Sequence, residues 1–349
     1  DLGWGNVGFH NSENDEINTP TLDDLALNGL QLDRHYVYSG CSPTRASMQS
    51  GRLPVHVTVN NGDGLMDGTH GIPKQMTGIA TKLKSAGYQT HLVGKWDAGF
   101  NTYAKLPAAK GYDTFYGYLS KSIGYFTKYG DNDCDSVAFM DLWENDKPAA
   151  SNMDEVDGTR YVEYEFADRV TSLIEDAAND EDNTPFYIMY SMHLPHYPAE
   201  LPEDDLEEHD DDENYCQANN DYIYPGFSDG DLFKCRSTLQ SQVNTMDSII
   251  GGIIDKLKEL SLYENTLIVF TSDNGGSLEL DDTAGNNWPL RGGKSSNLEG
   301  GIRATALVSG GYLPSSRYGQ IEAGLMHIAD WYTTFCELAG VDPNDYDAM

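Results

Sequence analysis

Basic residues are scarce in this chain of 349 residues, which has 22 Lys and Arg against 56 Asp and Glu and a formal net charge of −34. Binding to nucleic acid by counterion release requires a basic face, so the composition excludes a general nucleic-acid-binding protein. The same charge argues against docking on anionic membranes. It suggests a salty or acidic environment, in which self-repulsion is screened or titrated away.

Long apolar runs are also absent. The longest candidates lie around Ile249–Ile254 and Leu267–Phe270, whereas a membrane-spanning helix needs about 20 apolar residues. The chain begins at Asp1 without a basic and apolar leader. We therefore expect a processed or trimmed start, with any targeting segment outside the sequence, and no membrane segment within it.

Paired cysteine motifs are missing too. The five cysteines are Cys41, Cys134, Cys216, Cys235 and Cys336. None forms a C-x-x-C pair, which disfavours a zinc ribbon or a thioredoxin-type redox site. Cys216 and Cys235 flank a polar stretch, and in an oxidising compartment they either close that loop as a disulfide or stay reduced. No internal repeat or proline-rich linker indicates a domain boundary.

Three familiar motifs are incomplete. The pattern Gly3-x-Gly5-x-x-Gly8 is followed by a polar stretch, whereas a dinucleotide site would need a helix there. The run Gly293-Lys294-Ser295 lacks the first glycine of a P-loop, because Trp288 stands in its place. The run Asp131–Asp135 starts like an EF-hand but lacks the glycine at position six and the glutamate at position twelve.

Short apolar runs alternate with helical patterns along the chain. We expect buried strands at Gln31–Val37, Thr90–Val93, Phe186–Met192, Leu267–Thr271 and Thr305–Ser309, and helices at Thr21–Leu27, Ile79–Ala86, Tyr161–Ala178, Thr238–Leu260 and Ile328–Ala339. This alternation predicts a layered α/β domain with a largely parallel sheet. The acidic run from Glu203 to Glu213 predicts a solvated loop, with an additional cation site as the alternative.

The clearest helical pattern begins near Thr238. The residues at steps of four and three are Leu239, Val243, Met246, Ile250, Ile253, Leu257 and Leu260. This spacing predicts one apolar face packed on the core rather than a groove for a partner.

Unusual polar residues stand where the expected strands end. Lys95, His193 and the pair Asp273-Asn274 each follow a strand, and Asp1 precedes a glycine-rich turn as it would after a strand outside the chain. Ligands bind beyond the carboxyl ends of strands in open α/β sheets, so we expect these residues to converge. Carboxylate and amide oxygens suit Ca²⁺ or Mg²⁺. Taken alone, Asp273-Asn274 with its two following glycines is also typical of a plain turn.

Cys41 precedes Pro43, a residue suited to the first turn of a helix. A cysteine there meets the free N–H groups and the helix dipole, which favour a nucleophilic thiolate. Soft sulfur is a poor match for a site of hard cation ligands. The mismatch vanishes if Cys41 is oxidised to an aldehyde, whose hydrate offers oxygens both to a cation and to an electrophile.

These residues resemble a known family. Cys41-x-Pro43-x-Arg45 with Ser50-Gly51-Arg52 resembles the sulfatase signature, whose cysteine is converted to formylglycine. Gly94-Lys95-Trp96 resembles the second sulfatase signature, and residues 273–276 and 292–303 resemble later blocks. The Asn-Asn-Trp-Pro-Leu-Arg run at 286–291 and the start of the chain are most similar to the arylsulfatase B (N-acetylgalactosamine-4-sulfatase) branch.

The resemblance implies a fold and a metal site. The fold is an alkaline-phosphatase-like layered α/β/α domain with a mostly parallel central sheet. Residues 1–349 are then expected to be a sulfatase catalytic domain cut at both ends, with a smaller C-terminal domain missing. Asp1, Asp273 and Asn274 would hold Ca²⁺, or alternatively Mg²⁺, together with the formylglycine derived from Cys41.

The resemblance also implies catalytic roles. Arg45 would hydrogen-bond the aldehyde hydrate, Lys95 and Lys294 would hold sulfate oxygens, and His193 would stand by the leaving oxygen. A hydrate hydroxyl would attack sulfur while cations neutralise the charge. The second signature departs from the family, because Asp97 stands where a histidine is usual. Asp97 is then a substituted base, a repurposed residue or a mark of lost turnover.

The resulting hypothesis is a calcium-dependent sulfuric ester hydrolase acting on a sulfated saccharide or aryl sulfate. It would be matured by the formylglycine-generating enzyme and would be secreted or held in a lysosome-like or vacuole-like compartment. One alternative is an impaired sulfatase-like protein that binds sulfated glycans. The other is a phosphodiesterase or phosphonate hydrolase of the same superfamily. Selectivity would depend on the loops at 120–144 and 202–234.

Overall fold

The computed structural model of the chain describes residues 1–12, 17–60, 71–130, 139–149, 158–205, 229–278 and 285–345. It divides into two compact units, unit 1 with Asp1–Ser39 and Leu194–Met326, and unit 2 with Gly40–His193 and His327–Met349. Among the described residues, no helix is both long and apolar enough to cross a membrane. Cys216 and most of the acidic run at 203–213 lie outside the described residues, so the Cys216–Cys235 disulfide stays a prediction.

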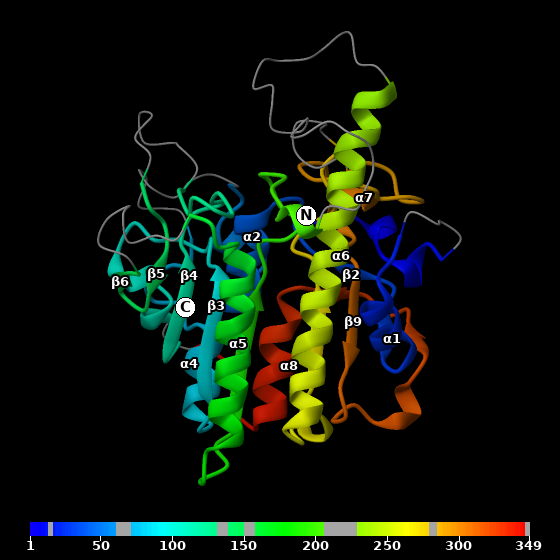
Figure 1. The fold of residues 1–349 in the computed structure, drawn as a ribbon. Coiled ribbons are helices and arrows are strands. Elements are labelled where there is room, and N and C mark those ends of the chain that lie inside the picture. The colour runs from blue at the N-terminus through cyan, green and yellow to red at the C-terminus, as the bar shows by residue number, and fades with distance from the viewer. Residues whose placement is uncertain are drawn as a thin grey trace. The chain divides into compact units, whose positions relative to one another are not determined.

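The sheet of unit 2 has five strands, and β3 lies between β4 and β7 (Figure 1). Its strand order is β6-β5-β4-β3-β7, and the elements are β3 (Gln89–Lys95), β4 (Thr114–Tyr118), β5 (Trp143–Glu144), β6 (Lys147–Pro148) and β7 (Phe186–Ser191). Strand β3 pairs in parallel with both β4 and β7, and the short β5 and β6 are antiparallel. Six of the seven residues of β3 are buried, as expected for a parallel strand covered on both faces.

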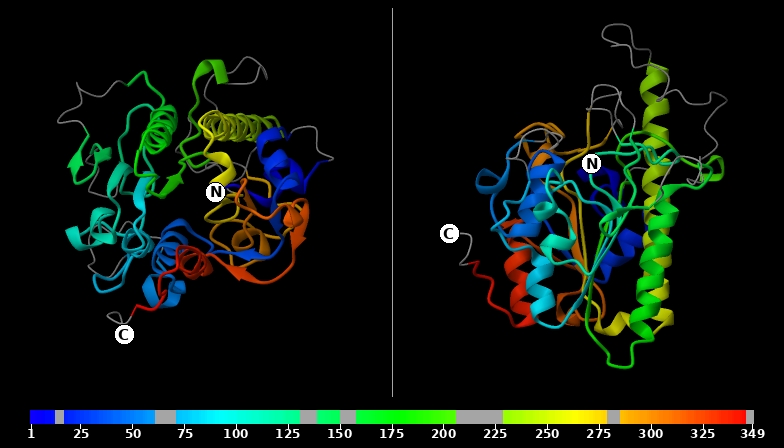
Figure 2. Two further views of the ribbon diagram at one scale, coloured as in Figure 1. Left: turned by 90° about the horizontal axis from the view of Figure 1, so that it is seen from below. Right: turned by 90° about the vertical axis from the view of Figure 1, so that its left-hand side faces the viewer.

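Helices cover both faces of this sheet (Figure 2). One face carries α5 (Val162–Ala178), and the other carries α4 (Ile79–Ser85), which packs with α2 (Cys41–Ser50) and α8 (Asp330–Ala339). The short α3 (Pro54–Val57) follows α2. Helix α5 buries Val162, Phe166 and Val170, a spacing of four residues that keeps one face on the sheet. Unit 2 therefore has the expected α/β/α layering.

The sheet of unit 1 has the order β10-β1-β9-β8. Its strands are β1 (Leu30–Leu32), β8 (Ile268–Thr271), β9 (Ala306–Ser309) and β10 (Gln320–Glu322), and β2 (His35–Tyr36) pairs with β11 (Met326–His327). Strand β1 runs parallel to β10, whereas β9 is antiparallel to β1 and β8.

The prediction of one continuous strand over Gln31–Val37 is wrong. The chain turns between β1 and β2 at Asp33-Arg34. Arg303 fixes this turn, because its Nε donates to the carbonyl oxygen of Asp33 (2.7 Å) and its Nη2 donates to Asp33 Oδ1 (2.6 Å). A charged pair thus interrupts an otherwise apolar run.

The helices of unit 1 are α1 (Pro20–Leu27), α6 (Asp229–Glu259) and α7 (Glu299–Ile302). Helix α1 packs on β9, and α6 packs on α1. Helix α6 begins nine residues before the predicted Thr238, and Ile249 and Ile254 are more buried than the predicted Ile250 and Ile253. The pattern therefore located the apolar face to within one residue.

Helices α6 and α1 are joined by a buried carboxylate. Asp247 of α6 accepts hydrogen bonds from the backbone N–H groups of Thr21 (2.9 Å) and Leu22 (2.8 Å) in the first turn of α1. These donors have no partner within their own helix, so Asp247 acts as a cap supplied by another element. Short 3-10 turns at Trp4–Asn6 and Gly8–His10 follow the first glycines, which agrees with the rejection of a dinucleotide fingerprint.

Candidate active site

Unit 1 gathers a buried carboxylate, an amide and an ammonium group. The side chain of Asp1 is fully buried. Its Oδ1 accepts a hydrogen bond from Asn274 Nδ2 (2.7 Å), and its Oδ2 accepts one from Lys294 Nζ (2.7 Å). A buried carboxylate is costly unless charge and hydrogen bonds compensate it, and Lys294 supplies both.

Asp273 completes this set at the end of β8. Its Oδ1 lies 3.0 Å from the backbone nitrogen of Asp1, and its side chain is nearly buried. Ser272 holds the two segments together, because its Oγ accepts from the backbone N–H of Leu2 (3.1 Å) and donates to the carbonyl oxygen of Asn274 (2.7 Å). The structure thus brings together four of the predicted residues, namely Asp1, Asp273, Asn274 and Lys294.

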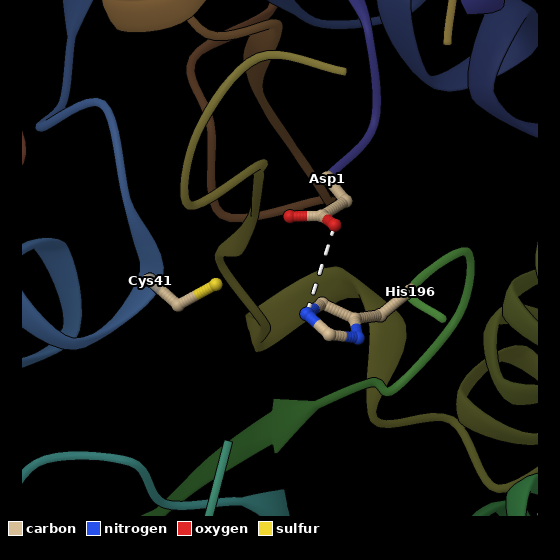
Figure 3. Close-up of side chains that lie close together, drawn as sticks. All are labelled: Asp1, Cys41 and His196. Carbon is tan, nitrogen blue, oxygen red and sulfur yellow. Dashed lines mark ion pairs between the residues drawn. The ribbon is translucent and has the colours of Figure 1, made fainter. Parts of the chain in front are cut away.

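A histidine that the sequence analysis did not single out joins them. Figure 3 shows the ring of His196 turned toward Asp1, with Nε2 lying 3.7 Å from Asp1 Oδ2. The same nitrogen lies 3.3 Å from Lys294 Nζ. Nδ1 lies 2.8 Å from the carbonyl oxygen of Tyr197, to which it donates. That bond fixes the tautomer, so Nε2 is the acceptor in the neutral ring.

The donor set of unit 1 fits a hard divalent cation. Asp1, Asp273 and Asn274 offer carboxylate and amide oxygens, the ligands that Ca²⁺ and Mg²⁺ prefer. Two nearly buried carboxylates carry two negative charges, and Lys294 compensates one of them. The oxygen and nitrogen of the Asn274 amide are interchangeable by a flip. These residues therefore suit a cation that brings further positive charge.

Unit 2 contains the predicted cysteine and arginine. Cys41, also labelled in Figure 3, is the first residue of α2, with Gly40 as the N-cap. This agrees with the predicted helix start. Arg45 stands four residues later on the same helix face. Its Nη1 donates to Ser191 Oγ and to the carbonyl oxygen of Lys95 (3.3 Å), so it ties α2 to the ends of β7 and β3.

Lys95 and Asp97 form a buried pair at the end of β3. Lys95 Nζ lies 3.5 Å from Asp97 Oδ2, with side-chain exposures of 1% and 7%. Asp97 Oδ1 accepts a hydrogen bond from Ser42 Oγ (2.7 Å). Asp97 has a φ of +44°, a left-handed conformation that aspartate tolerates better than most residues. The residue that departs from the family pattern therefore links the second signature to α2.

His193 lies in an aromatic cluster of unit 2. Its ring stacks on Tyr125 with centroids 4.2 Å apart and meets the edge of Tyr118 at 5.2 Å. Its backbone N–H donates to Oε2 of the buried Glu163 (3.0 Å), whose Oε1 accepts from the hydroxyl of Tyr190 (2.8 Å). Burial raises the pKa of Tyr118 well above its ordinary value, so that hydroxyl stays protonated.

Comparison with known proteins decides the family. The sulfatase family pattern matches residues 1–341. The chain belongs to the sulfatase family. Arylsulfatase J of Mus musculus is 32% identical over 341 residues, which cover 97% of this chain and 51% of the relative. The sulfatase chain therefore spans about half the length of this relative.

Two solved structures have folds similar to that of the sulfatase chain. Ps i-CgsB in complex with k-i-k-neocarrahexaose superposes with a TM-score of 0.78 at 28% identity, covering 99% of this chain and 71% of that one. The phosphonate monoester hydrolase of Agrobacterium radiobacter superposes with a TM-score of 0.62 at 19% identity, covering 98% and 72%. The second likeness concerns the fold alone. Together they confirm the expected alkaline-phosphatase-like α/β fold.

The predicted residues of this sulfatase chain thus fall into two sets. Asp1, Asp273, Asn274 and Lys294 belong to unit 1, and Cys41, Arg45, Lys95, Asp97 and His193 belong to unit 2. The strand-end argument missed His196, which lies five residues beyond β7. A signal was present in the sequence, because His196 repeats the histidine three residues earlier within the same loop.

Proposed function

We propose that the chain is the catalytic part of a sulfuric ester hydrolase that removes sulfate from a sulfated saccharide. Family membership supports the reaction, and the oligosaccharide in the complex of Ps i-CgsB supports the substrate class. The observation that carries the proposal is the oxygen-ligand set of unit 1 with Lys294 beside it. A cation held by that set would, together with Lys294, supply the positive charge that an anionic sulfate group requires.

In unit 1, Asp1, Asp273 and Asn274 are proposed to hold Ca²⁺. When bound, the ion supplies positive charge that favours a sulfate oxygen. Lys294 binds a sulfate oxygen, and its contact with Asp1 fixes the direction of the ammonium group. His196 is proposed to lie beside the leaving oxygen, because its Nε2 is 3.3 Å from Nζ of Lys294, the residue proposed to bind sulfate. The sequence assigned this role to His193, which stays a prediction.

In unit 2, Cys41 is proposed to be converted to formylglycine by the maturation enzyme. Its hydrate would supply an oxygen nucleophile, which the thiol cannot. Arg45 keeps a guanidinium group on the helix face of Cys41. The arylsulfatase B branch and a secreted or lysosome-like location stay predictions.

Asp97 is proposed to lower the rate rather than to replace the usual histidine. Its carboxylate lies 3.5 Å from Lys95 Nζ and compensates a charge that sulfate would otherwise use. We expect Asp97→His to raise hydrolysis of an aryl sulfate. A large loss of hydrolysis in this variant would instead identify Asp97 as an adapted base.

The decisive experiment is sulfate release from a panel of sulfated saccharides, with the protein produced together with a maturation enzyme and extended at both ends. Peptide mapping should find formylglycine at position 41, and Cys41→Ala should abolish turnover. An unmodified thiol under these conditions would refute the catalytic proposal. Phosphate-ester turnover exceeding sulfate-ester turnover would favour the phosphodiesterase alternative.

One observation favours a second function. Asp97, held in a buried pair with Lys95, stands where the family pattern has a histidine, so the usual base is missing, as expected for a protein that binds sulfated glycans without cleaving them. Equilibrium binding of a sulfated oligosaccharide by a formylglycine-containing protein, without any sulfate release, would establish this function. Sulfate release from the same oligosaccharide would exclude it.

A further inference from the structure

The groups proposed to hold calcium and sulfate in unit 1 come from three separate segments with closely packed backbones. A Cβ atom added to Gly276 would lie 3.1 Å from the Cα atoms of Gly3 and Gly285. One added to Gly3 would lie 2.2 Å from the carbonyl oxygen of Asn286. A side chain would clash at Gly3 and would be tightly crowded at Gly276. The register of these segments therefore depends on the hydrogen bonds that join them.

Asn287 makes two of these hydrogen bonds to a single residue. Its side chain is buried, with 3% exposure of the residue. Its Oδ1 accepts from the backbone N–H of Gly276 (2.8 Å), and its Nδ2 donates to the carbonyl oxygen of Gly276 (2.9 Å). The same carbonyl oxygen accepts from the backbone N–H of Lys294 (3.1 Å). Asn287 thus anchors Gly276, which lies two positions after Asn274. The carbonyl oxygen of Gly276 also holds the backbone N–H of Lys294.

The third segment is attached through the neighbouring residue. Asn6 Oδ1 accepts from the backbone N–H of Asn286 (2.8 Å), and the backbone N–H of Gly5 donates to the carbonyl oxygen of Asn286 (2.8 Å). The segment that begins with Asp1 is therefore bound to Asn286, and the Asp273–Gly276 segment to Asn287. Adjacent residues hold the two ligand-bearing segments in one register.

We propose that Asn287 is a positioning residue for the site of unit 1, which fixes Asn274 and Lys294 before calcium or sulfate binds. The inference rests on the proposed function. An amide presents one donor and one acceptor, which match the N–H and C=O of Gly276. Aspartate would match the N–H but repel the carbonyl oxygen, and alanine would leave both buried groups without this partner.

The test compares Asn287→Ala and Asn287→Asp with Asn28→Ala as a control. Asn28 is an exposed asparagine of the same unit whose Nδ2 donates to the carbonyl oxygen of Asp24. Calcium affinity is measured by titration calorimetry on chelator-stripped protein, and KM and kcat are measured with an aryl sulfate. We expect both Asn287 variants to lose about 10-fold to 100-fold in calcium affinity and to raise KM more than they lower kcat. Asn28→Ala should match the wild type.

A merely structural role gives a different pattern. The melting temperature would fall in the Asn287 variants, while the calcium affinity and KM of the folded protein would stay within about twofold of the wild type. That result would overturn the inference. Since Asn287→Asp keeps the bond from the Gly276 N–H, it is the variant expected to fold if Asn287→Ala does not.

Amide hydrogen exchange in the wild type provides an independent measurement. Without calcium, the backbone N–H groups of Gly276 and Lys294 should already be protected, because their partners are in place. Exchange at the rate of exposed loop amides would overturn the inference even if no variant folds. Protected amides in a wild type that neither binds calcium nor releases sulfate would refute the proposed function, and the positioning role with it.

Discussion

The buried pair of Lys95 and Asp97 allows a quantitative prediction about the stability of unit 2. Asp97→Asn preserves the shape of the side chain, the acceptor for Ser42 and the tolerance of a positive φ. It removes the negative charge 3.5 Å from Lys95 Nζ. Coulomb's law with an effective dielectric constant of about 20 gives about 5 kcal/mol at this separation. Removing one partner of a buried pair costs about 3–5 kcal/mol, so we expect Asp97→Asn to lower the free energy of unfolding by an amount in that range.

The assay is urea unfolding of a double-mutant cycle. Lys95→Met should cost a similar free energy, because it leaves Asp97 as a buried anion. The double variant should cost less than the sum of the two, with a coupling energy of about 0.5–3 kcal/mol. Lys84→Met is the control, because Lys84 pairs with Asp113 at the surface and should contribute about 0–1 kcal/mol.

Two results would refute this reasoning. The first is an Asp97→Asn variant whose free energy of unfolding stays within about 0.5 kcal/mol of the wild type, the range of an ordinary surface substitution. The second is strict additivity of the two substitutions, which would mean that Lys95 and Asp97 do not compensate each other. In either case the proposed effect of Asp97 on sulfate binding would lose its basis.

Three further predictions concern pH, metal and backbone. Burial lowers the pKa of His10 from 6.5 to about 3, and Arg303 acts in the same direction. Between these two pH values the unfolded chain binds a proton that the folded chain does not, so the free energy of unfolding should fall as the pH drops from 6.5 to 3, by up to about 1.4 kcal/mol per pH unit. Equal slopes of this free energy against pH in the wild type and in His10→Gln would contradict the prediction. Calcium at 100 times its dissociation constant should stabilise the chain by about 2.7 kcal/mol, and an unchanged melting temperature after chelation would contradict the proposed site. Gly51 and Gly340 have φ of +66° and +70°, but of the two only Gly51 would bring a Cβ against the Tyr332 ring, at 2.7 Å. Gly340→Ala should lower the free energy of unfolding by about 1–2 kcal/mol, and Gly51→Ala should lower it by about 1–3 kcal/mol more. Equal losses for the two variants in urea unfolding would refute the role of the ring.

The strands that the sequence predicted correctly share a continuous apolar run. Strands β3, β7, β8 and β9 were found within two residues at either end. Strand β4 was missed, because its sequence Thr-Phe-Tyr-Gly-Tyr combines aromatic residues with a glycine that usually weakens a strand. The structure explains Gly117, since a Cβ there would lie 1.9 Å from the carbonyl oxygen of Gly94. Close approach to β3 requires this glycine, and no periodicity could reveal that.

The candidate site was predictable where its chemistry depends on charge. Asp273, Asn274 and Lys95 stood out because they occupy equivalent places beyond the carboxyl ends of predicted strands, where ligands bind in open α/β sheets. His196 was hidden by its distance along the loop, and Asn287 was hidden because its role is to pair with the backbone of Gly276. A backbone partner carries no side-chain signature, so the residues that position a site are harder to predict than those that bind its ligands.

Asp97 is both a residue that stood out by its charge and a residue that positions its neighbours. The sequence alone identified it as a departure from the family pattern, and its charge suggested weaker sulfate binding. The contacts add that one oxygen accepts from Ser42, next to Cys41, while the other faces Lys95. A histidine at this position could not carry the negative charge that compensates Lys95. The exchange therefore alters how the second signature is held as well as how it reacts, and Asp97→His should change stability and turnover together.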